Sequence, residues 1–312
     1  MPTRTMSAET GSDLDFDSDS LELLGAANKP LAPGLYLVAT PIGNLEDITL
    51  RALRVLRSVD RIACEDTRQT QKLLNHFGIK TPTVSYHMHN EGSRSEELTA
   101  ELRAGGRIAV VSDAGTPGIS DPGGQIAAAA IAAGVTVYPI PGANAAISGL
   151  IASGLPTDCF IFHGFLPAKG GARKTALETL PRGALTHIFY EAPHRIEDTL
   201  ADVEAVFGAA QHVVIARELT KLHEEFLRGT VAGVRATLAA RTVRGEIVLL
   251  LAPAPEEAAA ADPKTSIRAE VAALMKAEGL AEKDALKRVA RERGIGKSEA
   301  YRELQREQNR RR

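Results

Sequence analysis

Between residues 35 and 140, short runs rich in apolar and β-branched residues alternate with segments whose apolar positions repeat at helical spacing. The runs, which we expect to be strands, are 35–40, 61–64, 83–86, 107–112 and 135–140. Strands separated by helices do not pair as simple hairpins. The alternation therefore predicts an α/β domain with a mostly parallel sheet covered by helices.

Several residues are expected to mark the ends of these helices. Asp47 is a candidate N-cap for a helix over 47–59, and Ser93 and Glu96 have the spacing of a capping box. Gly78 and Gly134 lie where a helix often ends on a left-handed glycine.

A second set of expected strands follows the Gly/Pro-rich stretch that ends at Pro156. These strands are 160–165, 185–191, 213–218, 225–229 and 246–252. Two of them are separated only by a short segment around Glu224, with no room for a helix, so this sheet is expected to be mixed. The predicted division is an N-terminal α/β domain over 33–150 and a C-terminal α/β domain over 151–253.

The near-neutral net charge of -2 hides a strong segregation along the chain. Residues 1–30 hold six acidic and two basic side chains, which predicts a disordered acidic tail over 1–32. Residues 264–312 hold 14 basic and 8 acidic side chains in helical patterns, after an Ala/Pro-rich linker over 254–263. This last segment is expected to be a small basic helical module of helix-turn-helix-like type, although a merely solvated helical hairpin has the same pattern.

Cysteine content and hydropathy indicate the cellular compartment in which the chain is expected. Cys64 and Cys159 have no neighbouring Cys/His pattern, so a disulfide framework or a zinc site is not indicated and both are expected to be buried thiols in a reducing cytoplasm. The longest apolar runs are far shorter than the roughly 18 to 20 residues that cross a bilayer, so we expect a cytoplasmic protein without a membrane partner.

Four loops rich in small or polar residues each follow an expected strand. They are loop one (40–44), loop two (65–68), loop three (112–123) and loop four (139–145). In open α/β sheets the carboxyl ends of the strands border the ligand crevice. Loop three combines Gly, Pro, Ala and Ser with two Asp residues, so a ligand can approach its backbone closely and carboxylates can accept bonds from ribose hydroxyls. No G-x-G-x-x-G follows the first strand, which disfavours a dinucleotide site and points to another nucleoside-like cofactor.

Taken together, the loops resemble those of the tetrapyrrole methylase superfamily. The motifs are VATPIGNLEDIT, ACEDTRQT, YHMHNE, SDAGTPGISDPG, PIPGANAAISGL, FYEAPHRI and RELTKLHEEFLRG, within residues 33–253. Within the superfamily, the chain is similar to the family that methylates the ribose 2′-hydroxyl of a cytidine in 16S ribosomal RNA. The acidic N-terminal extension departs from the family pattern.

This resemblance implies two α/β domains of tetrapyrrole-methylase type, a homodimer and S-adenosylmethionine as cofactor. The implied substrate is 16S rRNA in the decoding region of the 30S ribosomal subunit. Carried over by motif, the cofactor-binding residues are Pro41, Ile42, Asp113, Gly115, Thr116, Pro117, Ala143, Asn144, Ala145, Tyr190, Glu191, Ala192 and Gly245. The contact at Gly245 is expected to extend over its neighbours Arg244 and Glu246.

Methyl transfer to a hydroxyl needs a group that orients the hydroxyl or takes its proton. The candidates among the motif residues are Glu65, Asp66, Arg68, His89, Glu191 and Lys221, and also Asn90, Glu91, His194 and His223. Of the basic residues, Arg68, Arg195 and Lys221 suit phosphate contacts. With no metal-binding pattern in the sequence, metal-independent transfer is expected.

Two other functions stay open at this point. A methylase of a corrin or other tetrapyrrole precursor would have the same fold, but would leave the basic C-terminal module unexplained. A non-enzymatic regulator that binds nucleic acid would explain that module, but not the four loops.

Overall fold

The computed structural model describes residues 30–253, 267–292, 300–302 and 304–305. The chain divides into two compact units, residues 1–253 and 254–312. The expected acidic tail over 1–32 falls almost entirely outside the described residues, and the expected linker over 254–263 falls wholly outside them.

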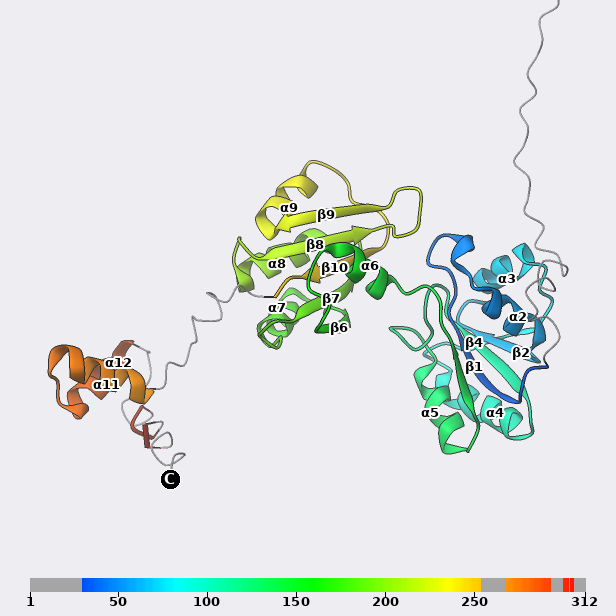
Figure 1. Ribbon diagram of the computed structural model, residues 1–312, viewed down its shortest axis with the longest axis horizontal. Coiled ribbons are helices and arrows are strands. Elements are labelled where there is room, and N and C mark those ends of the chain that lie inside the picture. The colour runs from blue at the N-terminus through cyan, green and yellow to red at the C-terminus, as the bar shows by residue number, and fades with distance from the viewer. Residues whose placement is uncertain (1–29, 254–266, 293–299, 303, 306–312) are drawn as a thin grey trace, which may run out of the picture. The chain divides into compact units, whose positions relative to one another are not determined.

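The first sheet is entirely parallel, as the alternation of strands and helices predicts. Its strands are β1 (Gly34–Val38), β2 (Arg61–Cys64), β3 (Thr83–Ser85), β4 (Arg107–Val111) and β5 (Val137–Ile140). They are arranged in the order β3-β2-β4-β1-β5, so that β1 and β4 are neighbours at the centre (Figure 1).

Two pairs of helices cover the two faces of this sheet (Figure 1). The helices α2 (Leu50–Ser58) and α3 (Thr67–His76) pack on one face, where Ile62 and Cys64 belong to the core. The helices α4 (Glu91–Arg103) and α5 (Gly124–Ala132) pack on the other face, where Ala63 belongs to the core. Because successive side chains of a strand point to opposite faces, both faces of β2 are buried.

The start of α2 differs from the prediction. Asp47 ends a short 3-10 helix, η1 (Leu45–Asp47), which the Asn44 side chain caps. The N-cap of α2 is Thr49, whose hydroxyl accepts a hydrogen bond from the Ala52 amide. The assignment of Asp47 was wrong because the 3-10 turn uses the residues that would have formed the first turn of a longer helix.

The predicted capping box of α4 is also wrong, whereas the two glycine ends are confirmed. The helix begins at Glu91, so Ser93 lies inside its first turn and donates to the Asn90 carbonyl. Gly78 and Gly134 follow α3 and α5 with φ of 61° and 74°. The amide of each glycine and that of the next residue donate to carbonyls in the last turn of the helix, which is the hydrogen-bond pair typical of a left-handed helix end.

The second sheet is mixed, as predicted from the pair of strands around Glu224. Its strands are β6 (Phe160–Phe165), β7 (Thr186–Glu191), β8 (His212–Arg217), β9 (Glu225–Thr230) and β10 (Ile247–Leu251). They are arranged in the order β6-β7-β10-β8-β9. Only β6 and β7 pair in parallel, while β7, β10, β8 and β9 form antiparallel pairs in that order.

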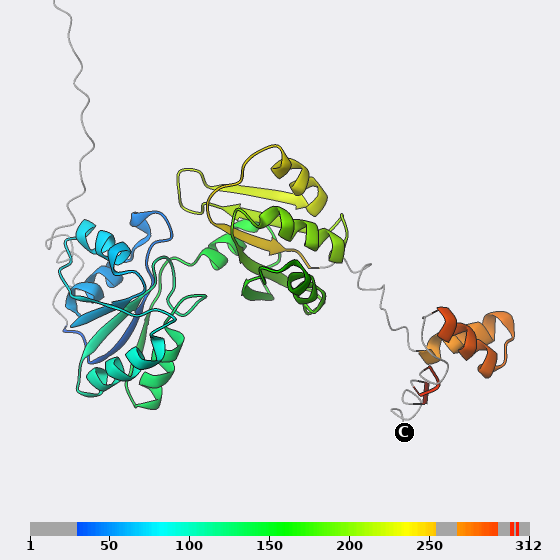
Figure 2. The ribbon, with the colours of Figure 1, turned by 180° about the vertical axis from the view of Figure 1, so that it is seen from behind.

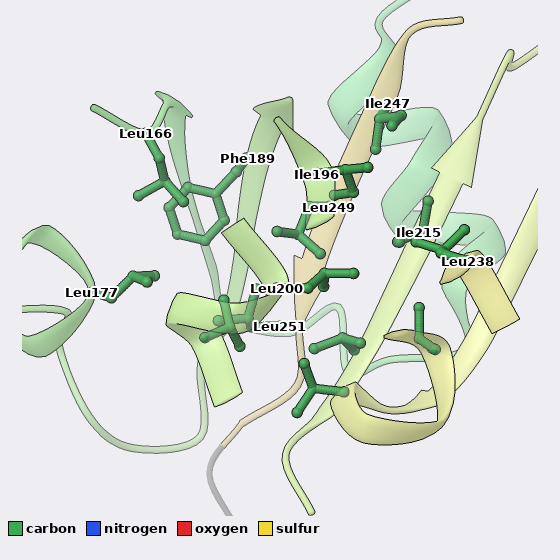
Figure 3. Packing of buried hydrophobic residues seen from close by; sticks show 14 of the residues in the cluster. Leu166, Leu177, Phe189, Ile196, Leu200, Ile215, Leu238, Ile247, Leu249 and Leu251 are labelled. Carbon is green, nitrogen blue, oxygen red and sulfur yellow. The ribbon is translucent and has the colours of Figure 1, made fainter. Parts of the chain in front are cut away.

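The second sheet also has a core on each face. One core is built with α7 (Gly170–Glu178), α8 (Ile196–Phe207) and α9 (Val231–Ala239), and its side chains are shown in Figure 3. The opposite face is covered by α6 (Ala145–Ser153); α6 is seen in front of the sheet in Figure 1 and α8 in the reverse view of Figure 2. Helix α6 therefore packs with the second sheet, and the domain limit expected at residue 150 falls inside it.

The C-terminal unit has a helical core of its own. It contains α11 (Ile267–Glu278), α12 (Glu282–Glu292) and helical residues among 300–305. The buried side chains are Ile267, Val271, Ala285, Leu286, Val289, Ala290, Ala300 and Leu304. A helix-turn-helix-like role for this unit stays a prediction.

Two further expectations concern the thiols and the membrane. Cys64 is buried, but Cys159 is exposed, so the expectation of two buried thiols was wrong for Cys159. It lies just before β6, an edge strand of the second sheet in which every residue is exposed or only half-buried. Within the described ranges, every helix is too short or too polar to cross a bilayer.

Candidate functional site

The centre of the first sheet has the topology that opens a ligand crevice. The strands β1 and β4 lie side by side, but the chain leaves β1 for α2 on one face and leaves β4 for α5 on the other. At such a switch point, the loops that follow the two strands part and leave room at their carboxyl ends. Loops one and three are the two that part here.

Hydrogen bonds between loops one and three hold the base of this crevice. The Thr40 amide donates to the Gly115 carbonyl over 2.9 Å, and the Gly115 amide donates back to Thr40 over 3.1 Å. Gly115 has φ of 84°, and an added Cβ would lie 3.3 Å from the Ile42 side chain. Glycine is required at this position because a left-handed backbone passes close to another loop.

A buried polar network anchors the other end of loop three. The Tyr86 hydroxyl donates to Glu91 Oε1 over 2.8 Å, and the same oxygen accepts from the Gly123 amide over 3.1 Å. The amide of Ile126, in the first turn of α5, donates to the Tyr86 hydroxyl. Burial raises the pKa of Tyr86 to about 12, so the phenol stays protonated as the donor to Glu91. Loop three is thus fixed at both ends.

The second sheet presents its own edge to the same pocket. In the register of the antiparallel pairs, Ile247 lies opposite both Glu191 and Arg217. The start of β10 therefore lies beside the ends of β7 and β8. Together with loops one to three and Ala145 at the end of loop four, this edge lines a pocket of about 460 Å³, within the usual range for small-molecule sites.

The pocket lining contains many of the residues that sequence motifs indicated. The predicted residues on its surface are Ile42, Glu65, Asp113, Gly115, Thr116, Ala145, Tyr190, Glu191 and Ala192. The predicted residues outside the lining are Pro41, Asp66, Arg68, His89, Pro117, Ala143, Asn144, Gly245 and Lys221. Of the expected contact region 244–246, Glu246 lies on the lining. The lining residues that were not among the predicted site residues are Ala114, Ile119, Ser120, Asp121, Phe165, Pro193, Ala216, Leu219, Ile247 and Val248.

Asn144 does not line the pocket, but it supports Thr116, which does. Its Oδ1 accepts from the Ile147 amide and caps α6, while its Nδ2 donates to Thr116 Oγ1 over 3.3 Å. The Thr116 hydroxyl donates in turn to the Ala143 carbonyl. The side chains of Asn144 and Thr116 therefore connect loop four to loop three.

Asp66 has a similar supporting role in loop two. Its carboxylate caps α3 by accepting from the Arg68 amide, and this hydrogen bond lowers its pKa. Its own amide donates to Asp113 Oδ1 over 3.1 Å, which joins loop two to loop three. The Arg68 side chain is 91% exposed and His89 is exposed as well.

Lys221 belongs to a charged cluster at the rim of the pocket. Its Nζ lies 2.9 Å from Glu218 Oε1 and 3.0 Å from Glu246 Oε2, and Glu246 lines the pocket. Burial alone would lower the pKa of Lys221, but its bonds to the two carboxylates outweigh burial and raise it. Gly245 makes room for this cluster, because an added Cβ would lie 2.3 Å from the Glu218 carboxyl carbon.

The carboxylate of Glu191 is already engaged within the protein. Its oxygens accept from the Ala192 amide over 2.8 Å and from the Thr199 hydroxyl over 2.7 Å. Arg195 lies 3.3 Å away and also donates to the carbonyls of Leu166 and Pro167. Both residues therefore hold the end of β7 in place. Of the other basic and polar candidates, His194 and His223 are exposed, while Asn90 precedes α4.

Asp121 is not among the predicted site residues, although it is one of the two Asp residues of loop three. Burial, followed by the charges of Glu65 and Asp113, raises the pKa of Asp121 to about 6. Ser120, directly before it, has φ of 62°, which is unusual for a residue other than glycine. The spacing of a small-residue loop after a strand was the available signal, but the burial that singles out Asp121 depends on the folded chain.

The lining combines two kinds of surface. Ile42, Leu219 and Val248 are apolar, and Tyr190 is packed against Phe165 with ring centroids 5.6 Å apart. The carboxylates of Glu65, Asp113 and Asp121 make the remainder acidic. Such a pocket fits a ligand with a flat apolar ring, hydroxyl groups and positive charge. Within the described part of the chain, no group of three or more His, Cys, Asp or Glu side chains is placed to hold a metal ion.

Comparisons with known proteins agree with this architecture. Residues 34–235 match the family model of tetrapyrrole (corrin/porphyrin) methylases. The chain is 49% identical over 267 residues to a ribosomal RNA small subunit methyltransferase I of Synechocystis sp., covering 86% of this chain and 95% of that protein. It is 44% identical to the protein of that name from Bacillus subtilis, covering 86% of this chain and 92% of the relative.

Solved structures share the fold at lower sequence identity. A uroporphyrin-III-C-methyltransferase from Thermus thermophilus matches with a TM-score of 0.51 and 21% identity, covering 70% of this chain and 94% of that one. A diphthine synthase matches with a TM-score of 0.54 and 14% identity, covering 70% and 89%. At these identities the likeness is one of fold.

Proposed function

The chain belongs to the tetrapyrrole (corrin/porphyrin) methylase family, and from this premise we propose that it is an S-adenosylmethionine-dependent methyltransferase of 16S ribosomal RNA. The proposed target is the ribose 2′-hydroxyl of a cytidine in the decoding region of the 30S subunit. The observation that carries this proposal is the identity of 44% and 49% to two relatives named for small-subunit rRNA methylation, over nearly their whole length.

The pocket supports the choice of cofactor. S-adenosylmethionine supplies an electrophilic methyl group on a positively charged sulfur. Asp113 and the backbone of loop three offer acceptors and close approach for a ribose or an amine, and Tyr190 with the apolar lining offers a surface for the adenine ring. The acidic lining favours the positive charge of the bound cofactor.

The same arrangement suits an RNA hydroxyl as the methyl acceptor. Residues of the lining must orient the hydroxyl, exclude water and receive a proton. For the phosphates, Arg68 is the best placed of the motif cations. All three are paired with carboxylates, but the Arg68 side chain is 91% exposed, whereas those of Arg195 and Lys221 are 20% and 29% exposed. The basic C-terminal unit supplies further cations. Metal-independent transfer, a homodimer and a cytoplasmic location remain predictions.

A transfer assay tests the proposal against its alternatives. Undermethylated 30S subunits, a corrin precursor and buffer alone would each be incubated with the protein and methyl-labelled S-adenosylmethionine. We expect label only in the 30S sample. Label in the corrin precursor would instead support a tetrapyrrole methylase. Binding to 30S subunits without any binding of S-adenosylhomocysteine would support a non-enzymatic regulator.

Asp113→Ala tests the assignment of the pocket. We expect binding of S-adenosylhomocysteine, measured by calorimetry, to weaken by about tenfold, because a charge-assisted hydrogen bond contributes on the order of 1 to 3 kcal/mol. An unchanged dissociation constant would remove Asp113 from the cofactor site.

A further inference from the structure

Five carboxylates line the pocket, and three of them already have partners. Glu191 is bonded to Thr199, Glu246 is paired with Lys221, and Asp113 accepts from the Asp66 amide. The two others are Glu65 and Asp121. Over the residues that the structure describes, neither of these two has a hydrogen bond or ion pair with another side chain or backbone group.

Asp121 differs from Glu65 in how the fold holds it. It lies in loop three between Ser120, whose φ is 62°, and Pro122, whose carbonyl accepts from the Gly118 amide over 3.1 Å. The following Gly123 is bonded to the buried carboxylate of Glu91. The backbone that carries Asp121 is therefore fixed on both sides, and a strained residue beside a pocket often marks a functional position.

We propose that Asp121 takes the proton from the substrate hydroxyl during methyl transfer, with Glu65 as its charged neighbour. This inference rests on the proposed function and goes beyond it by naming the proton acceptor.

The reaction balances with this assignment. The hydroxyl oxygen forms a bond to the methyl carbon as the carbon–sulfur bond breaks, and the bonding pair stays on sulfur, which becomes a neutral thioether. The proton of the hydroxyl passes to the Asp121 carboxylate, and the resulting carboxylic acid returns it to water after the product leaves. No further oxidant, reductant or co-reactant is needed.

The electrostatic surroundings suit a proton acceptor. Besides burial, the charged groups that act on Asp121 are Glu65 and Asp113, and both raise its pKa, which is about 6. Burial raises the pKa of the Tyr190 phenol, and the negative charge of Asp121 raises it further. A carboxylate with this pKa is ionised at pH 7, yet it is a better base than an ordinary aspartate.

Asp121→Asn, which keeps the size of the side chain, is the main test. We expect kcat for 30S methylation to fall by about 100-fold or more, as for loss of a general base. In the wild type, kcat should rise with pH through about 6 and then level off, and this limb should be absent in the variant. Binding of S-adenosylhomocysteine should stay within about threefold, which shows that the pocket is intact. Asp158→Asn, at an exposed position outside the pocket, is the matched control.

Two further measurements test the effect of Glu65 on the pKa of Asp121 and the titration of Asp121 in the unliganded protein. Glu65→Gln removes one of the charges that raise the pKa of Asp121, so the inflection of its pH profile should move to lower pH. Carbon-13 NMR of the unliganded protein should show a carboxyl signal that titrates near pH 6 and is missing in Asp121→Asn. A titration below about pH 4.5 would overturn the inference.

The outcomes separate this inference from the proposed function. A wild-type protein that methylates 30S subunits, together with an Asp121→Asn variant within threefold of its kcat, would overturn only the inference. A wild-type protein that binds cofactor but transfers nothing to 30S subunits would overturn the proposed function, and the inference with it.

Discussion

Gly245 and Glu218 meet at the start of β10, where the rim of the pocket is built. Glu218 accepts from the Glu246 amide over 3.1 Å and from Lys221 Nζ, although its own φ of 52° is unfavourable for a residue with a side chain. Gly245 has φ of 83° and leaves the space that the Glu218 carboxylate fills. Backbone strain is thus combined with a charge cluster at this rim.

Gly245→Ala should destabilise the protein more than its backbone conformation alone requires. Gly154 has nearly the same φ, 81°, but an added Cβ there meets nothing within 4 Å. We expect the free energy of unfolding, measured with urea, to fall by about 1 kcal/mol for Gly154→Ala and by about 2 to 4 kcal/mol for Gly245→Ala. Equal losses of unfolding free energy in the two variants would show that the Glu218 side chain can move aside from the added Cβ without an energetic penalty.

The raised pKa of Asp121 also predicts a pH-dependent stability. Because its pKa in the folded protein, about 6, exceeds the ordinary value of 3.8, the folded state holds this proton more tightly, and stability is lost as pH rises from 4 through 6. Asp121→Asn should therefore raise the free energy of unfolding by about 1 kcal/mol at pH 8, allowing for solvent screening, and leave it unchanged near pH 4. Thermal unfolding at the two pH values measures this, and a gain of the same size at both would contradict it.

Among the elements, loop three depends most on its anchor in the network of Tyr86, Glu91 and Gly123. The loop carries Asp113 and Asp121, and α5 begins directly after it. The network is buried, so an unsatisfied member would cost more than an exposed hydrogen bond.

Tyr86→Phe should therefore loosen the start of α5. The change removes the donor to Glu91 and the acceptor for the Ile126 amide. We expect a loss of about 1 to 3 kcal/mol in unfolding free energy and faster hydrogen exchange at Gly123 and Ile126. Tyr138→Phe is the control, since its hydroxyl has no hydrogen bond among the described residues. Unchanged exchange at the two amides would show that the network does not hold the loop.

The elements themselves could be predicted from sequence because their signals are local. The strands of both sheets were located by β-branched runs, and the loops by small residues at the ends of those runs. The roles of single residues within the loops could not be predicted in the same way. Lys221 pairs with Glu246, which is 25 positions away, and Asp121 lines a pocket to which both domains contribute residues. Such properties arise from tertiary contacts that no local pattern contains.

At the scale of the whole molecule, each of the two units has its own core. Among the residues that the structure describes, the core of the C-terminal unit is built from side chains between 267 and 304, and the pocket is lined by residues between 42 and 248. We predict that a chain ending at residue 253 binds S-adenosylhomocysteine within about threefold of the full chain. It should bind 30S subunits at least about tenfold more weakly, because 14 basic side chains are removed.

A variant with neutralised basic side chains distinguishes the effect of removing the C-terminal unit from the effect of removing its positive charge. Lys283, Lys287 and Arg291 are exposed on α12 at intervals of four residues. Changing all three to Gln should weaken 30S binding, measured by filter retention, and reduce its salt dependence. The same change at Lys72, Lys80 and Arg103, which are exposed on the first domain, is the control. Equal effects of the two triple variants would show that binding depends only on net charge.

The most direct test of the proposed function is to map the methylated nucleotide. Undermethylated 30S subunits would be incubated with the full chain and S-adenosylmethionine, and the 16S rRNA would be digested and analysed by mass spectrometry. We expect one added methyl group on the ribose of a cytidine in the decoding region, with the adjacent phosphodiester resistant to alkali. A methyl group on a base, or 16S rRNA that gains none, would contradict the proposed function.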